Sequence, residues 1–118
     1  MTVEIKKYPI IWNLELVRGG DWHHSVLLYE DDRVTPKNTT GYSMTMKVMK
    51  SHPNGELYDT LSTGNGRIVN TPSSGLFSIN LTAAQIDAYD FTSAVHRITY
   101  DDGAGNITPL AIGTVQVV

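Results

Sequence analysis

The segment Gly41–Val48, which reads Gly-Tyr-Ser-Met-Thr-Met-Lys-Val, decides how the rest of the chain is interpreted. Its large apolar side chains fall on every second position: Tyr42, Met44, Met46 and Val48. Polar side chains fill the positions between them: Ser43, Thr45 and Lys47. Because successive side chains of a strand point to opposite faces, this period of two predicts a strand with one buried face.

The same period extends outward from this segment in both directions. It predicts further strands over residues 10–17, 22–29, 56–62, 67–70, 77–81, 94–100 and 107–118. Turn signals rich in Gly, Pro, Asn and Asp separate them, at residues 18–21, 52–55, 71–75 and 101–106, and Gly64-Asn65-Gly66 is a hairpin signal. Seven to nine short strands of this kind predict an all-β antiparallel sandwich or barrel. With no linker in the chain, residues 1–118 are expected to form a single domain.

Three segments depart from the simple strand pattern. Residues 82–89 are predicted to form a short helical turn, because Thr82 is a good N-cap and Gln85 occupies the capping-box position. Pro109 predicts an edge or a bulge at the start of the last strand, since proline donates no ladder hydrogen bond. Residues 1–9 are predicted to be either an N-terminal arm or the first strand of the sheet.

Composition excludes several classes of protein. The chain has no cysteine, which excludes disulfides, cysteine-ligated zinc and thiol nucleophiles. Nine basic against twelve acidic residues give a net charge of −3 without a basic cluster, so nucleic acid is not expected as a ligand. No signal peptide is predicted, because no apolar run follows Lys6 and Lys7, and no membrane span is predicted, because the apolar uncharged run at residues 107–118 is far shorter than about 20 residues. We therefore expect a soluble protein made in a cytosol.

The search for catalytic, cofactor and metal sites yields no candidate. The four histidines are His23, His24, His52 and His96, and each is predicted to be a surface or half-buried side chain. His23 and His24 are adjacent in a strand and point to opposite faces, so they cannot hold one metal together. The Gly-x-Ser-x-Gly nucleophile motif is absent. The expectation is a protein that is not an enzyme and uses no cofactor or metal.

Two acidic pairs, Asp31-Asp32 and Asp101-Asp102, are candidates for an ion site. The segment Asp101–Asn106 resembles a calcium loop, but the twelfth residue from Asp101 is Ile112 rather than glutamate and the flanks are predicted strands. A plain hairpin turn is favoured, and an ion at this segment stays open as an alternative. The aromatic residues offer a similar choice between a sugar-stacking platform and ordinary packing, of which packing is favoured.

The order of short motifs along the chain resembles a tailed-phage virion domain. The motifs are Arg18–Asp21, Leu28–Asp32, Thr40–Met44, Ser74–Thr82, Arg97–Asp101 and Gly113–Val117, and together they span nearly the whole chain from about residue 10. This order is similar to the Ig-like N-terminal domains of upper-baseplate and tail-fibre attachment proteins. The chain departs from that pattern at Thr40, where leucine and threonine usually precede the glycine, and at Arg97, which is usually aspartate.

The resemblance implies an Ig-like sandwich and a structural role in the virion, with no catalytic residues to transfer. The expected function is an oligomeric adaptor or attachment component of the tail, baseplate or fibre region, assembled in the cytoplasm of the bacterial host. Its expected partners are other phage structural proteins and further copies of itself. A head decoration (cement) protein is an alternative within that class, and a carbohydrate-binding module with exposed Trp22 and Tyr29 is an alternative from another class.

Assembly contacts are expected at the two ends of the chain. The last strand, Thr114-Val115-Gln116-Val117-Val118, carries no charge and no proline, so it is expected to pair internally or with another subunit. Val3 and Ile5 of the N-terminal segment are predicted to contribute in the same way.

Overall fold

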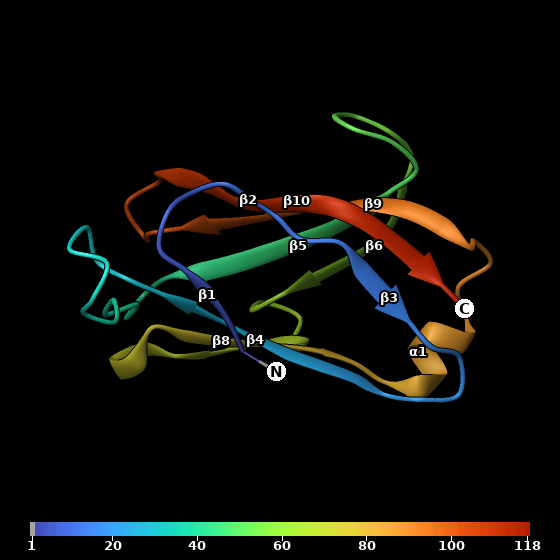
Figure 1. Cartoon of the computed structure of the whole chain (residues 1–118), viewed down its shortest axis with the longest axis horizontal. Helices are drawn as coiled ribbons and strands as arrows, with labels where there is room; N and C mark the ends of the chain where they lie inside the picture. The colour runs from blue at the N-terminus through green and yellow to red at the C-terminus, as the bar shows by residue number, and fades with distance from the viewer. Residues whose placement is uncertain (1) are drawn as a thin grey trace.

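Two β-sheets packed face to face make up the computed structural model, which describes residues 2–118 (Figure 1). The four-stranded sheet has the order β1 (Thr2–Ile5), β4 (Trp22–Leu28), β8 (Leu76–Leu81) and β7 (Ile68–Thr71). The six-stranded sheet has the order β2 (Ile10–Ile11), β10 (Ile107–Val117), β9 (Ser93–Asp101), β5 (Ser43–Met49) and β6 (Leu57–Ser62), and β3 (Leu14–Leu16) also pairs with β10. The predicted all-β sandwich is confirmed, and the sheets are open rather than closed into a barrel.

The core lies between the two sheets and follows the predicted alternation. In β5, Met44, Met46 and Val48 are buried, whereas Ser43 and Lys47 are exposed. The opposite sheet contributes Val26, Leu28, Phe77, Ile79 and Leu81, all buried to the same degree. Burial of these apolar side chains supplies the main driving force for bringing the two sheets together.

The sheets are mixed rather than purely antiparallel, which corrects the sequence prediction. The N-terminal segment pairs first with one sheet and then with the other: β1 runs parallel to β4, and β2 and β3 run parallel to β10. Residues 10–17 were predicted as one strand, but the structure divides them at Trp12 and Asn13. The prediction missed this division because the apolar alternation continues across the break, with Leu14 and Leu16 buried. The described residues thus hold ten strands instead of seven to nine.

The turn at Gly64–Gly66 was predicted to close a hairpin, and this prediction is wrong. The flanking strands β6 and β7 belong to different sheets, so the turn carries the chain across the sandwich. Arg67 fixes this crossing by donating to both carboxylate oxygens of Asp59, at 2.8 and 2.7 Å, and to the Thr60 carbonyl at 3.2 Å. Local turn chemistry cannot distinguish the two outcomes, because both need residues that tolerate a positive φ.

The predicted helical turn and the predicted bulge are both present. Helix α1 spans Ala83–Asp87, shorter than the predicted 82–89, and Thr82 and Gln85 form the expected reciprocal capping box. In β10 the register shifts between Pro109 and Ala111. Pairing with β2 begins only at Ala111, so Pro109 lies where β10 has β9 as its single neighbour and where the bulge occurs, as predicted. A short 3-10 helix at Pro72–Ser74 connects β7 to β8.

Candidate functional surface

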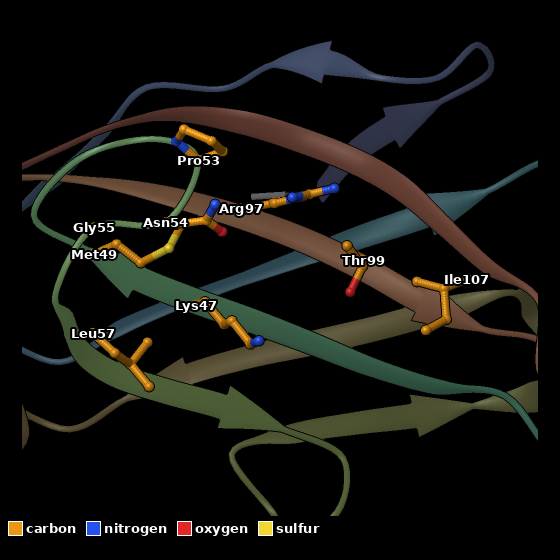
Figure 2. A pocket seen from close by; sticks show the side chains of 9 residues that line it. All are labelled: Lys47, Met49, Pro53, Asn54, Gly55, Leu57, Arg97, Thr99 and Ile107. Carbon is orange, nitrogen blue, oxygen red and sulfur yellow. The ribbon is translucent and has the colours of Figure 1, made fainter.

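The outer face of the six-stranded sheet carries a shallow groove, shown in Figure 2. Its volume is about 470 Å³. The floor is formed by side chains of β5 and β9, the loop 53–55 covers one end, and Ile107 of β10 lies at the other. Its lining residues are Lys47, Met49, Pro53, Asn54, Gly55, Leu57, Arg97, Thr99 and Ile107.

Strand register determines which side chains meet on this face. Lys47 of β5 lies directly opposite Arg97 of β9, and Arg97 lies opposite Ile112 of β10, which in turn lies opposite Ile11 of β2. The two cations are exposed, whereas Met49 is buried beneath the loop. The groove therefore combines two positive charges with apolar walls.

The histidines are placed as follows. His23 is exposed and lies 2.9 Å from Asn80 Oδ1, while His24 points inward and packs against Trp22 with ring centroids 4.4 Å apart. This confirms that the two face opposite ways. His52 is exposed in the loop before β6. His96 departs from the prediction because it is fully buried between the sheets, where its Nε2 donates a hydrogen bond to the Trp12 carbonyl.

Burial of His96 has a consequence for stability that is measurable as a function of pH. Desolvation lowers the pKa of His96 below its ordinary value and outweighs the opposing hydrogen bond to the Trp12 carbonyl. In the unfolded chain the ring takes up a proton near pH 6.5, whereas the folded ring does so only at lower pH. The stabilisation from the neutral ring is thus present above about pH 6.5 and is lost as the pH falls toward the folded pKa.

We therefore expect the free energy of unfolding to decline between about pH 7 and pH 5, with a slope of at most about 1.4 kcal/mol per pH unit from this group. His96→Gln should flatten that slope, as measured by urea unfolding at several pH values. His52→Gln is the comparison at an exposed position; because the charge of His52 is one of the smaller causes of the lowered pKa of His96, this variant should change the slope much less than His96→Gln does. Equal slopes for the wild-type chain and His96→Gln would contradict the assignment. The pKa of His24 is also lowered, mainly by burial, so some slope should survive in His96→Gln.

One carboxylate of each acidic pair, Asp32 and Asp102, accepts hydrogen bonds within its own turn. Asp32 accepts hydrogen bonds from the backbone N–H groups of Val34 and Thr35, each at 2.9 Å. Asp102 accepts from Ala104 N–H at 2.8 Å and from the Asn106 amide at 3.0 Å, and the Asn106 side chain is the main cause of its lowered pKa. Residues 101–106 connect β9 and β10 as the predicted hairpin turn. Within residues 2–118 no group of three or more His, Cys, Asp or Glu side chains is placed to hold a metal ion.

The aromatic side chains are used mostly in packing. Trp22 is buried, 8% exposed, and its ring lies 6.0 Å from that of Trp12. Tyr29 is half-buried, with the Lys6 ammonium 4.9 Å from its ring centroid. Trp22 is thus not exposed for sugar stacking, and Tyr29 is exposed only in part.

The residues predicted for assembly contacts divide between the core and the surface. Ile5, Val115 and Val117 are buried in the sandwich, Val3 packs against the core, and Thr114, Gln116 and Val118 are exposed. Pairing of the last strand is internal, since β10 lies between β9 and the segments β2 and β3. Sequence reasoning missed the groove, since Lys47 and Arg97 are 50 positions apart and only the register brings them together.

Comparisons with known proteins identify the fold. No protein-family model and no curated protein matches the chain. Among solved structures, it is similar to the N-terminal domain of phage TP901-1 ORF48, with a TM-score of 0.53 and 12% sequence identity over 98% of this chain and 93% of that one. It also matches extracellular domains 3–5 of Drosophila OTK, at 14% identity over 98% of this chain and 36% of that one, but with a TM-score of only 0.41. The first match confirms the likeness to a phage domain at the level of fold.

Proposed function

We propose that this chain is a structural component of a tailed-phage particle, acting as an oligomeric adaptor or attachment domain of the tail, baseplate or fibre region. The observation that carries the proposal is the match to the ORF48 domain, which spans both chains almost completely. The motif order from residue 10 onward supports the same assignment independently, since it is a property of the amino-acid sequence alone.

The surface chemistry supports a docking role. The groove presents two cations and several apolar side chains, and its lining residues include no histidine. We accordingly propose that the chain is not an enzyme and that its partners are other phage structural proteins. We expect it to bind neither nucleic acid nor membrane. No helix within residues 2–118 has the length and apolar character to cross a membrane.

The proposal is tested by quantifying the chain in particles. Particles produced by the genome that encodes this chain would be purified on a density gradient, and their proteins quantified by mass spectrometry. We expect the chain to co-purify in a fixed ratio to the tail proteins and to be lost from tailless heads. Co-purification with tailless heads would instead support the head decoration alternative. Absence from all particle fractions would overturn the proposal.

A further inference from the structure

Strand β9 carries opposite charges on either side of Thr99, all on the outer face of the six-stranded sheet. Ala94, His96, Ile98 and Tyr100 point into the core, so Arg97, Thr99 and Asp101 lie on the opposite face. Arg97 precedes Thr99 by two residues and Asp101 follows it by two. If the strand is turned end for end about Thr99, the positive and negative charges therefore exchange places.

The positive charge of Arg97 has no acidic partner within the described residues. Lys47 lies directly opposite Arg97, and like charges in directly opposed positions of a sheet destabilise it. The described part of the chain offers neither side chain an ion pair, since the three that occur involve Lys6, His23 and Arg67. Figure 2 shows both side chains on neighbouring strands at the floor of the groove. An acidic group from another molecule would relieve this repulsion.

Apolar side chains on the same face are exposed to an unusual degree. Ile11 is 78% exposed, Ile107 is 68% exposed and Leu57 is 52% exposed. Register places Ile107 opposite Asp101 and Leu57 opposite Met49, so these side chains flank the charged positions of β5 and β9. Exposed apolar patches next to polar residues often mark protein–protein interaction surfaces.

We propose that this face binds a second copy of the chain about a two-fold axis that lies between the two facing sheets, perpendicular to β9, and passes between the Thr99 side chains of the two copies. In that arrangement Arg97 of each copy meets Asp101 of the other, and the apolar side chains of both faces are buried together. A two-fold contact needs a self-complementary surface, which the alternating charges of β9 provide. The inference rests on the proposed oligomeric role and adds to it the face, the symmetry and the paired charges.

Charge reversal tests the pairing. Sedimentation equilibrium of the purified full chain should show a dimer, and Arg97→Asp or Asp101→Arg alone should weaken dimerisation by at least about tenfold. The double variant Arg97→Asp/Asp101→Arg should restore it, because each pair is re-formed with its charges exchanged. Asp90→Arg makes the same reversal from negative to positive charge at an exposed position outside this face, and it should leave dimerisation unchanged.

The controls separate loss of contact from loss of fold. Asp101 Oδ1 accepts a hydrogen bond from Gly103 N–H at 2.9 Å, and asparagine keeps that acceptor while removing the charge. Asp101→Asn should therefore weaken the dimer without changing the thermal unfolding midpoint. A monomer at all concentrations, a dimer insensitive to the single reversals, or a double variant that stays monomeric would each overturn the inference. A chain that is monomeric in solution yet present in particles would refute this inference and leave the proposed function standing.

Discussion

Replacement of Gly113 by alanine should lower the free energy of unfolding by about 3 kcal/mol. Gly113 lies in β10 where the segment between β2 and β3 crosses it most closely. A Cβ atom at this position would lie 2.1 Å from the Trp12 carbonyl oxygen and 2.6 Å from its carbon. Both are backbone atoms, so no side-chain rotation relieves the contact and the crossing segment must move away.

Movement of that segment would break the hydrogen bonds that hold it. Trp12 N–H donates to the Ile112 carbonyl at 2.9 Å, Asn13 Oδ1 accepts from Thr114 N–H at 3.1 Å, and the Trp12 carbonyl accepts from His96. The loss would leave the buried His96 ring without its hydrogen-bond partner, which adds to the steric cost.

Gly64→Ala is the matched control, because a Cβ at Gly64 meets nothing closer than Ser62 Oγ at 3.7 Å. Its free energy of unfolding should stay within about 0.5 kcal/mol of the wild-type value. Urea unfolding followed by tryptophan fluorescence measures both variants. Similar stabilities for Gly113→Ala and Gly64→Ala would show that the crossing is looser than described.

Replacement of Asp59 by alanine should be the second most damaging change, costing about 2–3 kcal/mol. Asp59 accepts two hydrogen bonds from Arg67 and one from the Tyr89 hydroxyl, and the ion pair is mostly buried, with side chains 19% and 22% exposed. Its removal leaves the Arg67 guanidinium without an acidic partner at the point where the chain crosses between sheets.

The remaining members of the network give graded expectations. Tyr89→Phe removes a single hydrogen bond to a charged group and should cost about 1.5 kcal/mol. Asp90→Ala, an exposed carboxylate without a hydrogen bond or ion pair in the described part of the chain, should stay within about 0.5 kcal/mol. Thermal and urea unfolding of the three variants rank these effects. Equal stability of Asp59→Ala and Asp90→Ala would contradict the role given to the network.

The same network predicts sensitivity to acid. Burial by itself would raise the pKa of Asp59, but the hydrogen bonds from Arg67 and Tyr89 outweigh it and hold the pKa below its ordinary value. The contribution of Asp59 is therefore present above about pH 4 and is lost as the pH falls through the folded pKa.

Much of the fold follows from local patterns in the sequence. Alternation over residues 41–48 correctly separated Met44 and Met46 from Lys47, and the capping box at Thr82 and Gln85 correctly located the helical turn. The bulge at Pro109 was likewise accessible, because the missing N–H of proline is a property of one residue. These features depend on neighbours in the chain, which a single sequence displays directly.

The features that depend on distant partners escaped prediction. Gly64–Gly66 carries the chain across the sandwich because β7 pairs with β8 in the other sheet, and the hydrogen bond of the buried His96 goes to the Trp12 carbonyl, 84 positions away in the chain. The groove is of the same kind, because Lys47 and Arg97 become neighbours only through the register of β5 and β9. The assembly contacts at the chain ends were predicted from the lack of charge and proline in the last strand. In the structure β10 pairs internally, and Val115 and Val117 are buried.

Cryo-electron microscopy of the assembled particle tests the central claim most directly. The account predicts density for this sandwich at the tail, baseplate or fibre attachment region, with the outer face of the six-stranded sheet, including Lys47 and Arg97, against a neighbouring subunit. A map of the complete particle without this chain, together with a free monomer in lysates of the same cells, would contradict the account.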